Sequence, residues 1–326
     1  MAPALFDNKT LLVTGGTGSF GRHFAQHALN HLNLRRLIIY SRDELKQWEL
    51  RQQLGDDARV RFFIGDVRDE KRLERAFDGV DVVVHAAAMK QIVTAEYNPS
   101  ECIQTNVMGA QNVIDAAISS GVKKVIALST DKASSPINLY GASKLVSDKL
   151  FVAANHYAAH SKTRFAVVRY GNVVGSRGSV IPLFRQLAET GVLPITDKRM
   201  TRFWITLQQA VEFVCDKLAT MHGGELFVPK IPSMRITDLA AALAPDAVLE
   251  ETGIRPGEKL HEEMISEDDA RRGIDTGDSY VILPVHADWG AELPSGQPLP
   301  DGFTYRSDTN SEWLSPDDLR QLIEDL

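Results

Sequence analysis

The sequence predicts an α/β fold in which a doubly wound parallel sheet is joined to a smaller C-terminal α/β domain. Short apolar runs of strand length alternate with stretches of helical periodicity as far as Gly171, and this alternation indicates a parallel sheet with right-handed crossovers. A glycine-rich loop joins the first apolar run to the first helical stretch. After Gly171 the alternation gives way to glycine and proline punctuation and to clustered basic residues.

Each apolar run is short and is followed by turn residues, as expected for strands buried on both faces of a sheet. The predicted strands are Lys9–Thr14, Arg36–Tyr40, Val60–Ile64, Val82–His85, Lys124–Ser129 and Phe165–Tyr170. The predicted helices are Phe20–Leu32, Glu44–Leu54, Pro99–Ser120 and Tyr140–Ala159.

The change of pattern after Gly171 suggests a division into two domains. We expect residues 1–171 to form a dinucleotide-binding domain, to which an amphipathic helix within residues 203–222 returns. Residues 172–202 and 223–326 are then expected to form the substrate domain. The tail from Ser266 reads as acidic and irregular, with a short closing helix near Pro316–Leu326.

The loop "GGTGSFG" follows the first strand and opens the first helix, which is the context that a dinucleotide-binding loop requires. Glycines at this position let the backbone approach a pyrophosphate, and the helix directs its N–H groups and positive dipole end at the phosphates. The sequence therefore predicts a Rossmann-type cofactor site that contains Gly15, Gly18, Ser19, Phe20 and Gly21.

The second strand ends without the acidic residue that NAD-binding folds usually present to the ribose about 20 residues beyond the glycines. Ser41 and Arg42 stand at that point, and Lys46 follows. Such residues suit a 2′-phosphate, so the predicted cofactor is NADP, held within the stretch Ser41, Arg42, Asp43, Glu44, Leu45, Lys46 and Gln47. Alternatively, or in addition, Ser41 or Asp43 caps the following helix.

Further candidates follow the third and fourth strands. Asp66 is placed to accept a hydrogen bond from adenine, with Val67 against the ring, although Asp66 could equally cap a helix. Ala86 leaves room for a cofactor backbone, and Lys90 lies within reach of ribose or phosphate. Asn106 either supports the catalytic loop or lies on the surface.

The stretch "STDKASSPINLYGASK" after the fifth strand carries the candidate catalytic residues. Tyr140 and Lys144 are four residues apart, and on a helix that spacing places them on one face. A free phenol has a pKa of about 10, and a nearby cation favours the phenolate, so Lys144 is expected to make Tyr140 a usable base. The spacing alone also fits a half-buried tyrosine beside a solvated lysine. Asp131 and Lys132 add an adjacent acid and amine.

Composition restricts the partners. The net charge of −7 argues against bulk binding to nucleic acid or to an acidic membrane. No apolar run approaches the ~18 residues that a membrane span requires, and the N-terminus lacks a secretory signal, so a soluble, cytoplasmic protein is expected. Cys102 and Cys215 fit no metal spacing and read as reduced thiols; no metal site is predicted. The basic residues of the second half suit a diphosphate, or are solvated surface charges.

TGxxGxxG, the Ser/Thr before the acid and YxxxK together resemble the extended short-chain dehydrogenase/reductase superfamily. Nucleotide-sugar 4,6-dehydratases of that superfamily usually have Glu where this chain has Lys132. With that departure, residues 8–265 resemble the inverting UDP-N-acetylglucosamine 4,6-dehydratases that begin pseudaminic acid synthesis in bacteria. The motifs concerned are "SRDELKQ", "GDVRD", "NLYGASK", "RYGNVVGSRGSV", "ITDKRMTRFWIT", "GGELFVPKIPSM" and "GIRPGEKLHE". A related retaining or membrane-anchored group tends to have Met in place of Tyr140.

The resemblance implies roles for individual residues. Tyr140 would take the proton of the sugar 4-hydroxyl with Lys144 as its electrostatic partner, and Asp131 and Lys132 would perform elimination and epimerisation. UDP-N-acetylglucosamine would contact Lys90, Ser129, Thr130, Asn172, Val173, Arg177, Arg202 and Arg255. It also implies a homo-oligomer, since extended members often form dimers or larger rings.

The sequence does not decide whether Lys132 is charged or neutral. Lys132 must be neutral to act as a base, yet the adjacent Asp131 favours its charged form, whereas burial favours the neutral form. Two other functions also remain open at this stage: a UDP-sugar 4-epimerase, which gives Asp131 and Lys132 no evident task, and a non-catalytic regulator that binds NADP.

Overall fold

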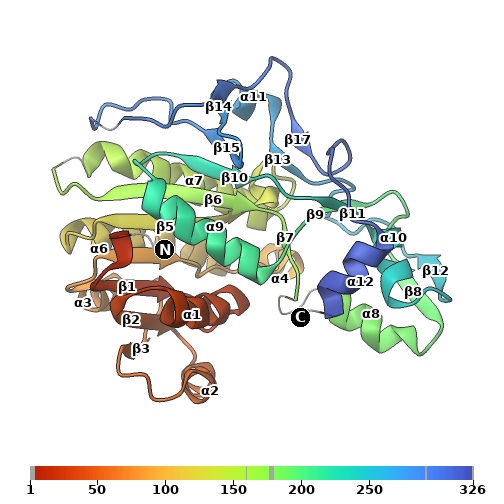
Figure 1. Ribbon diagram of the computed structural model, residues 1–326, viewed down its shortest axis with the longest axis horizontal. Helices are drawn as coiled ribbons and strands as arrows, with labels where there is room; N and C mark the ends of the chain where they lie inside the picture. Colours follow the sequence, from red (N-terminus) through yellow and green to blue (C-terminus); the bar gives the residue numbers. More distant parts are fainter. Residues whose placement is uncertain (1–3, 159, 176–179, 291, 325–326) are drawn as a thin grey trace.

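The computed structural model describes residues 4–158, 160–175, 180–290 and 292–324, and its centre is a ten-stranded sheet with the order β16-β14-β15-β10-β6-β5-β4-β1-β2-β3 (Figure 1). Seven neighbouring strands, from β3 to β10, run parallel, while β15, β14 and β16 join antiparallel. The strands are β1 (Lys9–Thr14), β2 (Leu34–Ser41), β3 (Val60–Ile64), β4 (Val82–His85), β5 (Lys124–Thr130), β6 (Arg164–Tyr170), β10 (Leu226–Pro229), β14 (Gly273–Asp275), β15 (Ser279–Ile282) and β16 (Gln297–Pro298).

Helices cover both faces of this sheet. On one face α9 packs against α1, β5 and β6; on the other, α6 packs between α3 and α7 (Figure 1). These elements are η1 (Ala4–Phe6), α1 (Ser19–His31), α2 (Glu44–Leu54), α3 (Glu70–Phe77), α4 (Ile92–Tyr97), α5 (Pro99–Ile103), η2 (Gln104–Met108), α6 (Gly109–Ser119), η3 (Asp131–Ala133), α7 (Leu139–Tyr157) and α9 (Leu207–Thr220). The predicted fold class, a Rossmann-type α/β sheet, is confirmed.

A second, smaller group of elements lies beside the carboxyl ends of the parallel strands (Figure 1). Its own buried apolar cluster includes Phe184, Leu193, Trp204, Leu239 and Leu319. The elements of this part are β7 (Asn172–Val173), α8 (Val180–Ala188), β8 (Val192–Ile195), β9 (Thr201–Ile205), β11 (Ser233–Arg235), α10 (Ile236–Leu243), β12 (Val248–Glu251) and α12 (Pro316–Glu324). Three further elements, β13 (Glu263–Ile265), α11 (Glu267–Ala270) and β17 (Tyr305–Arg306), contribute buried residues to the core of the main sheet instead.

The structure differs from the sequence-based expectation in the C-terminal part. Within residues 223–326, β10, β14, β15 and β16 belong to the main sheet rather than to a separate substrate domain. The tail from Ser266 is therefore not irregular: β15 pairs with β10 and extends the sheet. The expected helix Pro99–Ser120 is also interrupted, because a π-helical turn over Gln104–Met108 separates α5 from α6.

The core explains where ligands can bind. In β1 the residues Leu11, Leu12 and Val13 are fully buried, as are Val82, Val83 and Val84 in β4, because helices cover both faces of the sheet. No ligand can enter between such layers. The open edge lies beyond the carboxyl ends of the parallel strands, which is where ligands bind in sheets of this kind.

Candidate active site

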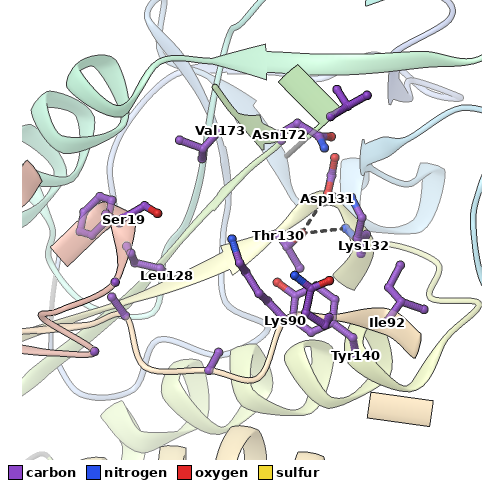
Figure 2. Close-up of a pocket in the computed structure, with 18 of the residues that line it drawn as sticks. Ser19, Lys90, Ile92, Leu128, Thr130, Asp131, Lys132, Tyr140, Asn172 and Val173 are labelled. Carbon is purple, nitrogen blue, oxygen red and sulfur yellow. Dashed lines mark hydrogen bonds and ion pairs between the residues drawn. The ribbon is translucent and has the colours of Figure 1, made fainter. Parts of the chain in front are cut away.

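A cleft of about 1300 Å³ runs along the carboxyl ends of the parallel strands and into the smaller part. Pockets for drug-sized ligands are typically ≈ 300–1,000 Å³, so this cleft has room for a dinucleotide and a second ligand. Figure 2 shows Thr130, Asp131, Lys132 and Tyr140 grouped together in this cleft.

Most of the residues predicted for the site line this cleft. They are Gly15, Gly18, Ser19, Phe20, Gly21, Ser41, Arg42, Asp43, Lys46, Asp66, Val67, Ala86, Lys90, Ser129, Thr130, Asp131, Lys132, Tyr140, Lys144, Asn172, Val173, Arg202 and Arg255. Glu44, Leu45 and Gln47 do not line it. The Gln47 amide is buried and donates to Ser41 and to the Phe63 carbonyl, so this side chain joins β2 to β3. Arg177 lies outside the described residues.

The glycine loop fits a pyrophosphate. A Cβ on Gly15 would lie 2.8 Å from the Ala87 nitrogen, and φ at Gly15 is +65°, so the loop requires glycine there. Gly18 caps α1 without a side-chain hydrogen bond, and the helix begins at Ser19. The N–H groups at a helix start attract phosphate. These residues therefore fit a dinucleotide cofactor.

Of the two residues predicted to cap the helix after β2, Asp43 is confirmed as the N-cap of α2. Asp43 accepts a hydrogen bond from the Lys46 backbone N–H at 3.0 Å and caps α2. The Lys46 ammonium lies 2.7 Å from the Asp43 carboxylate, and its hydrogen bonds lower the pKa of Asp43. The guanidinium of Arg42 lies 3.6 Å from Asp66 and is largely exposed. Arg42 and Lys46 thus place two positive charges in the lining of this half of the cleft.

Asp66 is not the helix cap that was the alternative interpretation. Asp69 caps α3 instead, through the Arg72 backbone N–H. The Asp66 carboxylate accepts hydrogen bonds from the backbone and the guanidinium of Arg68, the latter at 2.8 Å. It remains in the cleft wall beside Val67, so its predicted contact with adenine stays a prediction.

Asn106 connects two segments that form the site. It lies in the π-helical turn and is 1% exposed, so the alternative of a surface residue is wrong. Its amide oxygen accepts from Met89 N–H at 2.8 Å, and its nitrogen donates to the Met89 carbonyl and to the Ser143 hydroxyl, each at 2.9 Å. Asn106 therefore joins the loop after β4 to helix α7, which carries Tyr140.

Helix α7 begins at a junction with η3 and the segment before β13. Asn138 caps α7 through Gly141 N–H at 2.7 Å, and its amide donates to the Gly257 carbonyl at 2.8 Å. Lys259 donates to the Ser134 carbonyl at 2.7 Å. A segment far along the chain therefore holds the loop between η3 and α7, in the middle of the catalytic stretch, at two points.

Gly141 permits the close contact between α7 and η3, because a Cβ there would collide with the Lys132 carbonyl oxygen. We expect Gly141→Ala to destabilise the protein by about 1–3 kcal/mol, the usual cost of overpacking, and to displace Lys132. Helix propensity alone predicts the opposite sign, a gain of up to about 1 kcal/mol. Urea unfolding measures the change, with Ala142→Gly as the control for propensity. A more stable Gly141→Ala protein would contradict this packing.

The Tyr140 phenol is not activated by Lys144 in the way that the spacing predicts. Burial raises the pKa of Tyr140 to about 12, although Lys132 and a hydrogen bond with Thr130 act in the opposite direction. Burial also lowers the pKa of Lys144, a change that Asp148 opposes. Burial thus outweighs the cations around the phenol. Lys144 alone therefore does not bring this pKa near neutrality, and the expected role of Tyr140 as a base, which also depends on the positive charge of an oxidised nicotinamide, stays a prediction.

A buried network lies behind Lys144. Ser129 donates to Asp148 at 2.7 Å, and Arg169 lies 3.4 Å from the same carboxylate. Arg169 continues to the Met264 carbonyl and to Asp269. The Thr130 hydroxyl donates instead to Asp131 at 2.9 Å and lowers the pKa of Tyr140. A contact of Ser129 with substrate stays a prediction.

Asp131 and Lys132 form an ion pair that includes a third residue, which sequence reasoning missed. The Lys132 ammonium lies 3.0 Å from Asp131 and 3.0 Å from Glu262. Burial by itself lowers the pKa of Lys132, but the two carboxylates raise it well above its usual value. Lys132 therefore rests as an ammonium, which answers the question left open by the sequence. Burial raises the pKa of Asp131 despite Lys132.

The second wall of the cleft is largely apolar and was also missed. It includes Ile181, Phe184, Trp204 and Met234 from the smaller part. Arg202 is 6% exposed and donates to the carbonyls of Thr201, Lys259 and Leu260. Its guanidinium thus holds the segment before β13, and direct contact with substrate stays a prediction.

Among the residues that the structure describes, no group of three or more His, Cys, Asp or Glu side chains is arranged to hold a metal ion. None of the helices in the described part of the chain combines the length and the apolar character that crossing a membrane requires.

Known proteins with the same arrangement can now be compared. The polysaccharide biosynthesis protein family model matches residues 11–284. The inverting UDP-N-acetylglucosamine 4,6-dehydratase of Campylobacter jejuni is 55% identical, over 98% of each chain. The crystal structure of Pen from Bacillus thuringiensis has a TM-score of 0.89 and 36% identity, over 99% of this chain and 100% of that one. The dTDP-glucose 4,6-dehydratase DesIV of Streptomyces venezuelae, solved with NAD and TYD, has a TM-score of 0.69 and 27% identity, over 77% and 86%.

Proposed function

Since this chain belongs to the polysaccharide biosynthesis protein family, we propose that it is a UDP-N-acetylglucosamine 4,6-dehydratase that inverts C5 of the sugar. The observation that carries the proposal is the grouping of Tyr140, Asp131 and Lys132 in one cleft that also contains a dinucleotide loop. An epimerase requires only the tyrosine and the cofactor. Dehydration also requires an acid and a base for C5 and C6, and the pair supplies both.

The cofactor, when bound, supplies transient oxidation at C4 and reduction at C6. The chain performs the proton transfers. Tyr140 takes the proton of the 4-hydroxyl, and the resulting ketone acidifies the C5 proton. Lys132 removes that proton, while Asp131 protonates the departing 6-hydroxyl, which leaves as water. Protonation of C5 from the opposite face then inverts that centre.

Lys132 must first lose a proton, and the structure offers an acceptor. Its ammonium donates a hydrogen bond to Asp131 at 3.0 Å. Transfer along this bond converts an ion pair into a neutral acid and a neutral amine, which are the forms that the roles above require. A substrate that excludes water favours the neutral pair, since burial disfavours charged forms.

The test is incubation of the purified protein with UDP-N-acetylglucosamine in deuterated water. We expect a product lighter by one water, with deuterium at C5 and inverted stereochemistry. A product of unchanged mass would indicate a 4-epimerase. Binding of NADP without turnover would indicate a regulator.

NADP is the cofactor we propose, on the basis of Arg42 and Lys46 beside Ser41. Replacing Arg42 by Gln is expected to weaken NADP⁺ binding by about 10- to 100-fold, because one charge-assisted hydrogen bond contributes about 1.5–3 kcal/mol. NAD⁺ binding serves as the internal control and should change little. Isothermal titration with both cofactors measures this. Equal losses for NADP⁺ and NAD⁺ would argue against a 2′-phosphate contact.

The setting of the reaction is also part of the proposal. The motif resemblance supports a cytoplasmic homo-oligomer that begins pseudaminic acid synthesis from UDP-N-acetylglucosamine. Sedimentation of the purified protein tests the oligomer, and conversion of the product by the next enzyme of that pathway tests the assignment to it.

A further inference from the structure

Glu262, like Asp131, lies 3.0 Å from the Lys132 ammonium and is almost completely buried. Its backbone is fixed, because Glu262 N–H donates to the Ser307 hydroxyl at 2.9 Å and its carbonyl accepts from Ser307 N–H at 2.8 Å. The contact of the Glu262 side chain with Lys132 is therefore a fixed part of the structure. It is built into the site from the segment that precedes β13.

The charges around Lys132 nearly cancel. Asp131 and Glu262 are each 3.0 Å from its ammonium, and the Arg202 guanidinium lies 3.7 Å from Glu262. Further charged groups surround this set: Glu258 is 3.5 Å from Arg202, and the Lys259 ammonium binds the Ser134 carbonyl. The other titratable side chains nearby are Tyr140, His261, which faces Thr201, and Glu263, which faces Ser134 and Ser135.

Two oxygen atoms in this set have unused acceptor capacity. Asp131 Oδ2 and Glu262 Oε2 are buried without a hydrogen-bond partner among the described residues. Lys132 and Glu262 also line a side cavity of about 90 Å³ with Asn172 and Arg202. A buried carboxylate oxygen without a partner is costly, and Glu258 Oε2 beside this set is in the same state.

We propose that Glu262 is a positioning residue that holds Lys132 in its charged form and thereby sets the pH at which C5 of the sugar exchanges its proton. The inference rests on the dehydration proposed above. The attraction between Glu262 and the Lys132 ammonium, 3.0 Å apart, opposes transfer of that proton to Asp131 until substrate fills the cleft, although Glu262 also raises the pKa of Asp131 to a degree. In the resting protein the amine is then blocked as a base, and it becomes one only when the reacting carbon is in place.

The direction of the effect follows from the opposing influences on Lys132. Burial and Arg202 lower its pKa, whereas Asp131 and Glu262 raise it. Glu262 itself stays ionised, because Lys132 and Arg202 lower its pKa more than burial raises it. Without the Glu262 charge, only Asp131 raises the pKa of Lys132, while burial and Arg202 still lower it. The pKa of Lys132 then falls, and the neutral amine appears at lower pH.

Glu262→Gln keeps the size and one oxygen of the side chain while removing its charge. We expect the pH profile of deuterium incorporation at C5 to move to lower pH by about 1–3 units, the usual effect of one nearby opposite charge. Glu262→Asp, whose carboxylate is withdrawn by one methylene, should give an intermediate profile. Glu263→Gln is the matched control, since Glu263 is adjacent in sequence but binds Ser134 and Ser135 instead. Its profile should stay at the wild-type pH.

A purely structural role for Glu262 predicts a different result. Loss of an anchor for Arg202 would lower the rate by the same factor at every pH, without moving the profile. A wild-type profile in folded Glu262→Gln therefore overturns the inference. Should that variant fail to unfold cooperatively, the folded Glu262→Asp protein decides the question, and a wild-type profile there overturns it as well.

A second measurement needs no turnover. Lys132 is 19% exposed, so an amine-reactive acyl reagent can modify its neutral form, and peptide mass spectrometry can follow the modification against pH. In Glu262→Gln this modification should begin at lower pH by the same shift. If the wild-type protein dehydrates no sugar but the labelling shift appears, the proposed function fails, whereas the effect of the Glu262 charge on Lys132 is supported. If it dehydrates the sugar without a shift in either measurement, only the inference about Glu262 fails.

Discussion

Replacing Tyr140 by Phe is expected to lower turnover of UDP-N-acetylglucosamine by about 10²- to 10⁴-fold, the usual contribution of a positioned general base. The phenol hydroxyl is the group that the reaction would use first, and Tyr140 lies in the cleft beside Thr130, Asp131 and Lys132 (Figure 2). Phenylalanine keeps the ring and therefore the packing of α7. Without the hydroxyl, C4 is not oxidised and no later step begins.

Mass analysis of the product measures turnover, and titration with NADP⁺ checks that the cofactor site is intact. Tyr157→Phe is the matched control, because Tyr157 lies at the end of the same helix and is 53% exposed. It should keep wild-type activity. A Tyr140→Phe protein that also keeps activity to within a few-fold would remove the tyrosine from the mechanism.

Replacing Lys132 by Met should have two large effects. C5 exchange and dehydration should both fall by about 10²- to 10⁴-fold. Stability should also fall at neutral pH by about 3–5 kcal/mol, because removing one partner of a buried ion pair leaves the other charges uncompensated. The groups left behind are Asp131 and Glu262, whose side chains are 1% and 2% exposed.

The pH dependence of that loss has a definite sign. In the wild-type protein the pKa of Glu262 is lowered, so its ionised form stabilises the fold above its unfolded pKa, and this contribution is lost as pH falls through the folded pKa. Without Lys132 the pKa of both carboxyl groups rises. The deficit is then largest at neutral pH and becomes smaller on acidification, as the two groups take up protons.

Urea unfolding of Lys132→Met at neutral and mildly acidic pH measures both parts of this prediction. Lys149→Met is the control, since Lys149 is an exposed lysine of α7. It removes one positive charge without exposing a buried carboxylate. Equal stability of Lys132→Met and wild type at neutral pH would show that the three charged groups do not depend on one another.

Six of the seven parallel strands could be predicted from the sequence to within two residues, because each contains a short apolar run; β10 is not among the predicted strands. The strand Lys9–Thr14 is found at its predicted bounds. The strands β14 and β15 could not be recognised in the same way. They have three and four residues and include Gly273, Asp275 and Ser279, and they are strands because β10 offers an edge for pairing.

In the site, too, features within one short segment could be predicted, whereas contacts between distant segments could not. The glycine loop and the Tyr140–Lys144 spacing are local, so sequence reasoning found them. Glu262 lies within the motif "GIRPGEKLHE", but its ion pair with Lys132 exists only once distant segments pack together. The raised pKa of Tyr140 has a similar cause, since burial depends on the whole fold and a residue spacing contains no measure of it.

The contacts of Gly257, Lys259 and Glu262 with the catalytic stretch have a consequence for how the enzyme matures. During synthesis on the ribosome, the seven parallel strands and the dinucleotide loop emerge before these three residues do, whereas β14, β15 and β16 emerge after them. A chain that ends before Gly257 lacks the contacts of Gly257 with Asn138, of Lys259 with Ser134 and of Glu262 with Lys132. The segment that fixes the catalytic stretch is therefore synthesised late, and such shortened products should not consume UDP-sugar.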